Sequence, residues 1–353
     1  MLAILPNQWF ESLPQSWLLL IVALALICVI RGSDWLVEGV AGIARRLGMS
    51  KVIIGATIVS LGTTSPEAAV SVLAAWQGDA GLALGNGVGS IIADTGLIFG
   101  LGCLLTRLPA DRFVLTRQGW VQFGTAMLCC VICYGLFALW GDGAVIGRWV
   151  GVLFTSLLVC YMVLSIKWSR QHPVGEPPIE VTDQDRSVEE LKSFGLLVLL
   201  TLVGLVLVIF AADGLVQSVS QLARRWGIPE TVIAATMIAL GTSLPELIVG
   251  LTAIRRGHPE LLVGNVIGAD ILNMLFVIGA AALAAPLPIV EIGSARPNIL
   301  LEVHLPTMLL MLILFRVYIA RAVSNGSFSR WMGAPLIVMY VAFVSLSYWL
   351  SLG

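Results

Sequence analysis

Residues 61–67 read LGTTSPE, and residues 240–246 read LGTSLPE. Both stretches lie inside runs that are apolar enough to cross a lipid bilayer. A proline within a helix removes a backbone donor and clashes with the carbonyl one turn earlier, and a glutamate in hydrocarbon is costly. Because the chain contains this costly combination twice, the two breaks are expected to mark a functional site.

The composition defines the class of protein around these breaks. Hydrophobic residues make up 58% of the chain and charged residues 12%, whereas a soluble domain has about 25% charged residues. A helix needs roughly 20 apolar residues to span the bilayer. The sequence therefore predicts an all-α polytopic membrane protein with about ten transmembrane helices, near residues 17–45, 51–75, 81–106, 118–140, 147–167, 193–223, 229–254, 260–285, 299–320 and 331–351.

The two halves of the chain are copies of each other. Glu246 follows Glu67 by 179 residues, and the same offset relates Gly85-Asn86 to Gly264-Asn265. A polar linker over 168–192 separates a first five-helix repeat, residues 1–167, from a second, residues 193–353. An odd number of spans lies between equivalent positions, so the second repeat must enter the membrane inverted. Inverted repeats of this kind are typical of transporters, with the site at the repeat interface near the bilayer midplane.

The distribution of basic residues predicts the orientation. Most Lys and Arg fall on the cytoplasmic side if both termini are outside and the 168–192 linker is cytoplasmic. Arg224 and Arg225 fall outside, as the inverted equivalents of Arg45 and Arg46. The sequence therefore predicts a multi-pass membrane protein in this orientation.

The repeated motif offers hard oxygen ligands at membrane depth. Its prolines are expected to free backbone carbonyls, those around Leu61–Thr63 in the first copy, and irregular backbone persists in hydrocarbon only where another group satisfies it. Hydroxyl and carboxylate oxygens add to these carbonyls. Such ligands suit Ca²⁺, and Na⁺ is similar in size. The candidate ligands from the two motifs are Thr63, Thr64, Glu67, Thr242, Ser243 and Glu246.

The helix that follows each motif presents a second set of polar groups. These helices begin GNGVGSIIAD at 85–94 and GNVIGADILN at 264–273, and their glycines allow close approach to the broken helix. One face of each helix, at i, i+4 and i+8, can complete the cage. The positions on these faces are Asn86, Ser90 and Asp94 in the first copy and Asn265, Ala269 and Asn273 in the second.

Other interpretations of these residues are weaker. The motif could merely kink a packed helix, and GNGVG could be a phosphate-binding loop, although the second copy lacks its middle glycine. Paired intramembrane acids could belong to a hydrolase, but neither copy has a protease-type GxGD arrangement, so no enzyme is expected. The cysteines at 129, 130 and 133 are interpreted as packing residues. Asp34 is expected to pair with Arg31, and the environment of Asp270 stays open.

The repeated GTSxPE-type segments, each followed by a GNxxGS/A helix, resemble the two alpha-repeats of the sodium/calcium exchanger family within the cation/calcium exchanger superfamily. The resemblance implies four central ion sites on the second, third, seventh and eighth helices. It implies that Glu67 and Glu246 hold Ca²⁺ with help from Thr63 and Thr242. It places Na⁺ at flanking sites that use Thr64, Ser243 and Ser90. The long first and sixth helices, which carry Asp34 and Asp213, would slide to alternate access.

Three positions depart from the family pattern. Ala269 stands where a serine ligand is usual, the pair Asp94 and Asn273 is often reversed, and Ser65 replaces a common leucine. The missing hydroxyl at Ala269 bears on one sodium site and so on the coupling ion. The carboxylate cage and the resemblance together predict Ca²⁺/Na⁺ antiport, with an H⁺-coupled or other monovalent-coupled divalent cation exchanger as the alternative. The resemblance is to a bacterial-type exchanger, which the short linker fits, and it implies a bacterial inner membrane. The expected ligands are the transported ions, Ca²⁺ and Na⁺ and in the alternative H⁺. The chain contacts the lipid bilayer, and neither a cofactor, nucleic acid nor an obligatory protein partner is implied.

Overall fold

The structure is a computed structural model that describes residues 7–47, 49–171, 193–227, 243–290 and 299–352. The described part of the first half is built almost wholly from helices. Its elements are α1 Asn7–Ser12, α2 Gln15–Leu47, α3 Lys51–Ile54, η1 Gly55–Val59, α4 Ser60–Thr63, α5 Ser65–Trp76, α6 Ala80–Ala93, η2 Asp94–Phe99, α7 Gly100–Leu105, β1 Leu108–Pro109, α8 Arg112–Trp140, η3 Gly141–Gly143, β2 Val145–Ile146 and α9 Arg148–Gln171.

The second half repeats this order. Its described elements are α11 Phe194–Arg225, α13 Leu244–Arg255, α14 Pro259–Leu272, η4 Asn273–Ile278, α15 Gly279–Ala284, β3 Leu287–Pro288, η5 Leu300–His304, α16 Leu305–Asn325, β4 Ser327–Phe328, η6 Arg330–Met332 and α17 Gly333–Leu352. The elements α13, α14, η4, α15 and β3 each begin 179 residues after α5, α6, η2, α7 and β1. The structural repeat thus follows the offset found in the sequence.

The spans also agree with the sequence prediction. In the described ranges, eight helices are long and apolar enough to cross a membrane, and the bent pair Lys51–Thr63 and Ser65–Trp76 brings the count to as many as nine. The predicted seventh span begins outside the described residues, and α13 forms its second part. The all-α membrane architecture with about ten spans is therefore confirmed.

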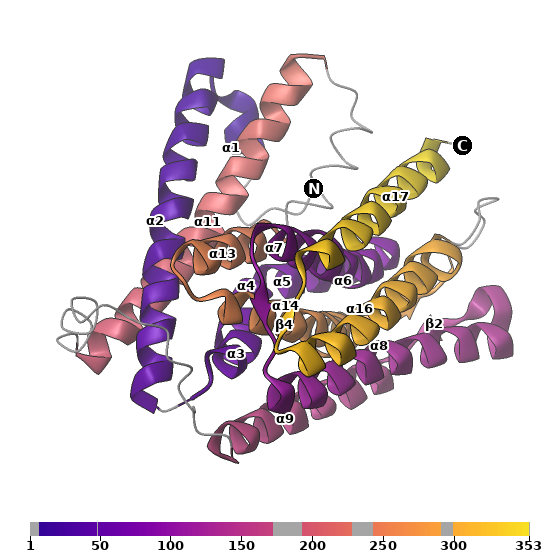
Figure 1. Cartoon of the computed structure of the whole chain (residues 1–353). Helices are drawn as coiled ribbons and strands as arrows, with labels where there is room; N and C mark the ends of the chain where they lie inside the picture. The colour runs from indigo at the N-terminus through magenta and orange to yellow at the C-terminus, as the bar shows by residue number, and fades with distance from the viewer. Residues whose placement is uncertain (1–6, 48, 172–192, 228–242, 291–298, 353) are drawn as a thin grey trace.

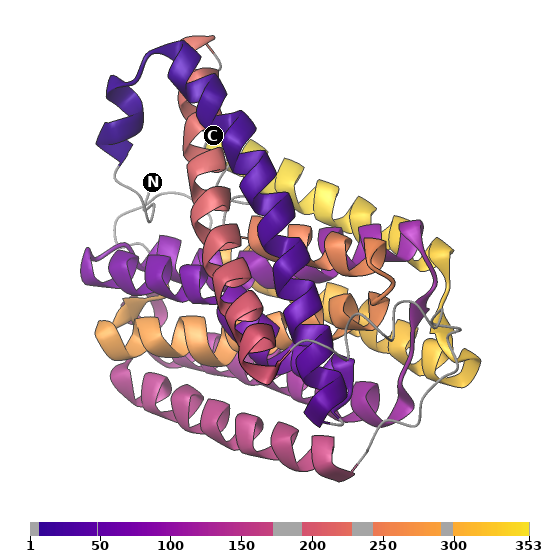
Figure 2. The same cartoon turned by 90° about the vertical axis from the view of Figure 1, so that its left-hand side faces the viewer.

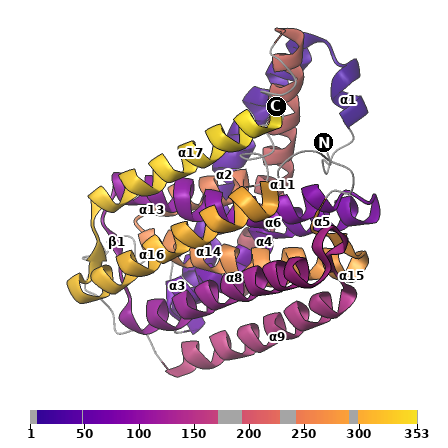
Figure 3. The same ribbon diagram turned by 90° about the vertical axis from the view of Figure 1, so that its right-hand side faces the viewer.

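Two long helices lie apart from the rest of the bundle. Figure 1 shows α2 and α11 side by side, and Figure 2 shows that they cross the other long helices at a steep angle. Helices α8, α16 and α17 run across the remaining body, seen from its other side in Figure 3. In the most apolar stretches of α2 and α11, 28% and 22% of residues are buried, against 72% and 83% for Ala80–Leu105 and Pro259–Ala284. The third and eighth spans therefore form the centre of the molecule.

Close contact between backbones positions this centre. A Cβ atom added to Gly264 would lie 2.1 Å from the Val52 carbonyl oxygen, and one added to Gly268 would lie 2.4 Å from Ala56 Cα. Any side chain at these positions would overlap the opposing backbone. The glycines of the GNxxG segment therefore let α14 pack directly on α3, η1 and α4, as the sequence predicts.

Two short strand pairs join the halves, and the sequence analysis missed both. β1 pairs with β4 through Leu108 and Phe328, and β2 pairs with β3 through Ile146 and Leu287. We call these pairs the strand clasps. Each clasp takes one strand from each half, so both hold the two repeats together.

Buried cysteines contribute to the apolar core. Cys129, Cys130 and Cys133 of α8 belong to the main cluster of buried residues, together with Phe99 and Phe315. All six cysteines of the chain are unbridged. The interpretation of the cysteine cluster as packing residues is confirmed.

The close approach at Gly268 generates a test of the fold. Gly268→Ala should lower the thermal unfolding midpoint in detergent, because overpacking costs about 1–3 kcal/mol or more. Gly124→Ala on α8 is the matched control, since nothing lies within 4 Å of its added Cβ. An unchanged midpoint for Gly268→Ala would contradict the packing of α14 on η1.

Candidate functional site

Both motif glutamates lie in the first turn of a helix that begins at the break. The α4 and α5 segments are bent by 43°, with Thr64 as the N-cap and Pro66 in the first turn of α5. In the second copy, Ser243 is the N-cap of α13 and Pro245 lies in its first turn. The positive end of the helix dipole at such a terminus favours a nearby negative charge. The proline of each motif therefore produces a helix start that suits its glutamate.

One freed carbonyl is satisfied within the protein, which corrects the sequence analysis. The hydroxyl of Ser65 donates a hydrogen bond to the carbonyl oxygen of Leu61 at 2.5 Å. The Leu61 oxygen is thus already paired and need not be satisfied by an ion. Ser65, the residue that departs from the family pattern, explains this local difference.

The pseudo-twofold axis passes between Asp94 and Asn273. These two residues are 179 positions apart and are therefore equivalent, and Asn273 Nδ2 donates to Asp94 Oδ2 at 3.4 Å. A residue that contacts its own equivalent must lie at the axis of the repeat. Both residues are buried, at the points where the third and eighth spans change to π-helical geometry. Short π-helical segments of this kind are frequent at functional sites.

The carboxylates gather near this axis and are buried. Glu67 is 1% exposed, Glu246 is 2% exposed and Asp94 is 1% exposed. The negative charge of Asp94 acts on both Glu67 and Glu246. The hydroxyl of Thr64 donates to Glu246 Oε1 at 3.3 Å, which links the first motif directly to the second.

Several oxygens at the site have no hydrogen-bond partner although they are buried. They include Glu67 Oε2, Glu246 Oε2, Asp94 Oδ1, Asn273 Oδ1 and Ser243 Oγ. A buried polar atom without a partner costs about 1–3 kcal/mol, and more when it is charged. These oxygens come from five residues of both repeats, and all of them are hard donors that suit Ca²⁺ or Na⁺. The donor set therefore fits a shared cation.

The equivalent asparagines of the two repeats, Asn86 and Asn265, hydrogen-bond to the broken helices. Asn86 Nδ2 donates to the Glu67 carbonyl oxygen at 3.2 Å and to Ser71 Oγ at 3.0 Å. Asn265 accepts from Ser60, and its side-chain oxygen lies 3.5 Å from the Thr63 hydroxyl. Asn86 and Asn265 thus position the broken helices through these hydrogen bonds.

The remaining predicted ligands have separate outcomes. Ser90 is buried on α6 between Asn86 and Asp94. Thr242 lies outside the described residues. Within the described part of the chain, three or more His, Cys, Asp or Glu side chains nowhere come close enough to hold a metal ion by themselves. A cation at this site would therefore need hydroxyl, amide or backbone oxygens in addition to the carboxylates.

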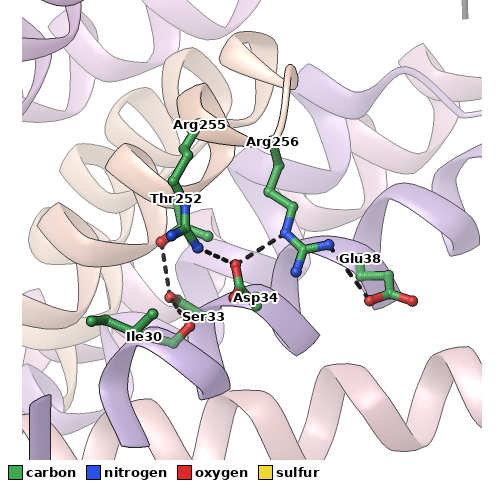
Figure 4. A network of polar contacts seen from close by, with 7 residues as sticks. All are labelled: Ile30, Ser33, Asp34, Glu38, Thr252, Arg255 and Arg256. Atoms are coloured by element: carbon green, nitrogen blue, oxygen red, sulfur yellow. Dashed lines mark hydrogen bonds and ion pairs between the residues drawn. The ribbon is translucent and has the colours of Figure 1, made fainter. Parts of the chain in front are cut away.

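Asp34 belongs to an ionic network outside this group, and its predicted pairing was wrong. Its Oδ1 atom accepts hydrogen bonds from Arg255 and, at 3.0 Å, from Arg256, rather than pairing with Arg31. Arg256 also approaches Glu38 at 3.7 Å, and Figure 4 shows the network. We call the contacts of Asp34 and Glu38 with Arg255 and Arg256 the ionic latch. Sequence spacing favoured the local partner, whereas packing of α2 on α13 brings the distant ones.

A hydroxyl contact accompanies the ionic latch. The side-chain oxygens of Ser33 and Thr252 lie 2.8 Å apart and are both buried (Figure 4). The ionic latch and this contact together join the long helix α2 to the end of the span that carries Glu246.

Comparisons with known proteins agree with this geometry. The sodium/calcium exchanger protein family matches residues 17–167 and 196–349. The sodium/calcium exchanger MaX1 of Methanosarcina acetivorans is 30% identical over 94% of this chain and 98% of its own. The inner membrane protein YrbG of Escherichia coli is 30% identical over 94% of this chain and 97% of its own.

A solved structure shares the architecture. The sodium-calcium exchanger NCX_Mj, soaked with Na⁺ and Sr²⁺, superposes with a TM-score of 0.76 at 27% identity, over 94% of this chain and 99% of its own. The similarity to these relatives therefore extends over nearly the whole chain, including both repeats. The chain belongs to the sodium/calcium exchanger protein family.

Proposed function

We propose that this protein is a Ca²⁺/Na⁺ antiporter whose ions bind in turn at one cage around the pseudo-twofold axis. The observation that carries the proposal is the burial of Glu67 and Glu246, from opposite repeats, each with an unpartnered oxygen beside Asp94 and Asn273. The named function of MaX1 and NCX_Mj supports it.

The cage explains why transport would occur as exchange. Uncompensated charges in a low-dielectric interior cost several kcal/mol each. Ca²⁺, or several Na⁺ ions, would offset the charges of Glu67 and Glu246, so that the site could pass through a closed state. An empty cage would keep its net negative charge and resist that passage. The ligand set comprises Glu67, Glu246, Thr63, Thr64, Thr242, Ser243, Ser90, Asp94, Asn273, Asn86 and Asn265.

The helices α2 and α11 would alternate access by moving against the central spans. The ionic latch holds α2 to α13 in the structure. The positions equivalent to Arg255 and Arg256 in the other half are Trp76 and Gln77, so the same pair of arginine contacts cannot form there. The ionic latch therefore favours one of the two access states over the other.

The protein would lie in a bacterial inner membrane with both termini outside and the 168–192 linker in the cytoplasm. The bias of basic residues supports this orientation. The printed name of YrbG, an inner membrane protein, supports the location.

Removal of one cage carboxylate tests the proposal directly. Glu67→Gln should abolish Na⁺-driven uptake of radioactive Ca²⁺ into vesicles and weaken Ca²⁺ binding by more than about 100-fold, because loss of a buried charge partner costs about 3–5 kcal/mol. Glu11→Gln, the same change at an exposed residue of α1, should behave as the unmodified protein. Unchanged Ca²⁺ binding in Glu67→Gln would contradict the proposed role of Glu67 as a Ca²⁺ ligand.

Coupling to protons is the alternative, because Ala269 provides no hydroxyl for one expected sodium ligand. In sodium-free vesicles with a proton gradient, the unmodified protein should take up no Ca²⁺ above the protein-free background. An outward-directed sodium gradient at equal pH on both sides should restore uptake. Proton-driven Ca²⁺ uptake without sodium would show that H⁺, and not Na⁺, is the coupling ion.

The ionic latch leads to a prediction about conformation. Asp34→Asn should speed hydrogen–deuterium exchange in the last turn of α13 and change the apparent Ca²⁺ affinity several-fold, since a shift between access states changes the population that binds. Asp142→Asn, in an exposed loop, is the control. If exchange in Thr252–Arg256 and Ca²⁺ affinity both stay unchanged, the latch has no part in the access equilibrium.

A further inference from the structure

Asp270 occupies a second buried polar site next to the cage. It is 1% exposed on α14, and its Oδ2 atom accepts a hydrogen bond from Thr95 Oγ1 at 2.6 Å and one from Gln122 Nε2 at 2.5 Å. Both donors are neutral. The carboxylate thus has two hydrogen bonds on one oxygen and no positive partner among its described contacts.

Asp270 and its partner Gln122 each have a buried oxygen without a hydrogen bond. Asp270 Oδ1 and Gln122 Oε1 are buried without a hydrogen bond, as are both polar atoms of Gln118. Gln118, Gln122 and Thr125 lie on one face of α8 at i, i+4 and i+7, and all three are buried. A buried carboxylate oxygen and a buried amide oxygen on two residues in contact, both without donors, are a pair that a bound positive charge would satisfy.

The site exists in one half only. At the equivalent positions in the other half, Ile91 replaces Asp270 and Met274 replaces Thr95, and both are fully buried apolar side chains. The fold therefore packs well at this place without any carboxylate. A buried charge that the repeat does not need for packing is expected to have a binding role.

The charged groups around Asp270 do not neutralise it. Asp94 on η2 is an acid whose negative charge repels that of Asp270. On α3, Lys51 binds Glu260 and His258, and on α13, Arg255 binds Asp34. Glu246 of α13 also acts on Asp94 and so adds negative charge. On α8, which also packs against α14, Arg117 lies over the Phe113 ring. Arg316 of α16 lies over the Trp120 ring beside Gly119 of α8. Among the described residues, none of these cations forms an ion pair with Asp270.

We propose that Asp270, with Gln122 and Thr95, forms an additional monovalent-cation position whose occupancy alternates with Ca²⁺ in the cage. This inference rests on the proposed antiport function. The occupant is a single positive charge, either an alkali ion shared by Asp270 Oδ1 and Gln122 Oε1 or a proton on Asp270 Oδ1. Asp270 bonds to Thr95, the residue that follows Asp94 of the cage. Because the two positions are this close, Ca²⁺ in the cage would repel a positive charge at Asp270 and weaken its binding. The position would thus supply a ligand in the repeat that lacks the hydroxyl at Ala269.

Calorimetric Ca²⁺ titration of the purified full chain tests the position. Titrations at several Na⁺ concentrations give the number of Na⁺ ions displaced per Ca²⁺, and titrations in two buffers of different ionisation enthalpy give the number of protons released. Asp270→Asn should lower one of these numbers by about one, because mass-action linkage counts the ions exchanged. Asp142→Asn, the same chemical change in an exposed loop, should lower neither.

The two arms identify the source of the charge. If Asp270→Asn lowers the number of Na⁺ ions displaced per Ca²⁺, the charge at Asp270 is an alkali ion. If it lowers the number of protons released, the charge is H⁺. Unchanged counts in both arms overturn the proposal. If the unmodified protein binds no Ca²⁺ at all, the proposed antiport function fails. This result differs from one in which Ca²⁺ binds and Asp270→Asn changes neither count.

A second variant covers the case in which Asp270→Asn does not fold. Thr95→Val keeps the carboxylate and removes one donor to Oδ2. It should shift the Na⁺ or proton concentration at which Ca²⁺ binding is half-inhibited by at least several-fold. If a folded Thr95→Val protein shows the same half-inhibiting Na⁺ and proton concentrations as the unmodified protein, the proposed cation position at Asp270 is also overturned.

Discussion

The need to neutralise buried negative charge governs the centre of this protein. Glu67, Glu246 and Asp94 are each no more than 2% exposed, inside spans that cross hydrocarbon. A buried carboxylate is costly unless helix dipoles, hydroxyl groups and a cation offset its negative charge. The proline breaks place Thr64 and Ser243 as N-caps next to the glutamates, and the glycines of α14 bring its polar face close. The rest of the fold supports this arrangement.

The sequence contained most of the architecture because apolar length and repetition are local signals. Runs of about 20 apolar residues are read directly from composition, and the 179-residue offset extends from Asp34 to Pro109 without an alignment gap. The proline of each motif predicted a break in its helix for the same reason. The sequence therefore predicted the spans, the inversion and the candidate cage.

Long-range contacts could not be predicted in the same way. Asp34 and Arg255 are 221 residues apart, and only the packing of α2 on α13 brings them together. The neutral partners of Asp270 come from η2 and α8, which its own helix does not reveal. The strand clasps have two residues per strand, too few to show a period of two. The Leu61 carbonyl shows the same limit, because the sequence did not indicate that Ser65 would satisfy it.

The departures from symmetry are chemically coherent. The halves share the order of their described helices, the π-helical segments η2 and η4 and the clasps. They differ in that Asp94 faces Asn273, Trp76 and Gln77 stand at the positions equivalent to Arg255 and Arg256, and Asp270 has Ile91 as its counterpart. A symmetric frame would give two access states of equal free energy. Differences confined to a few polar side chains change the balance between these states and the ions bound without altering the fold.

The strand clasps also bear on how such a chain could arise. In each clasp, the strand that follows the third span of one half pairs with the strand that follows the fourth span of the other half, namely β1 with β4 and β3 with β2. Two separate copies of a single five-helix unit would therefore form both pairings between them when they associate in opposite orientations. Joining two such copies into one chain would then require only a connecting segment, because the strand pairs would already hold the copies together.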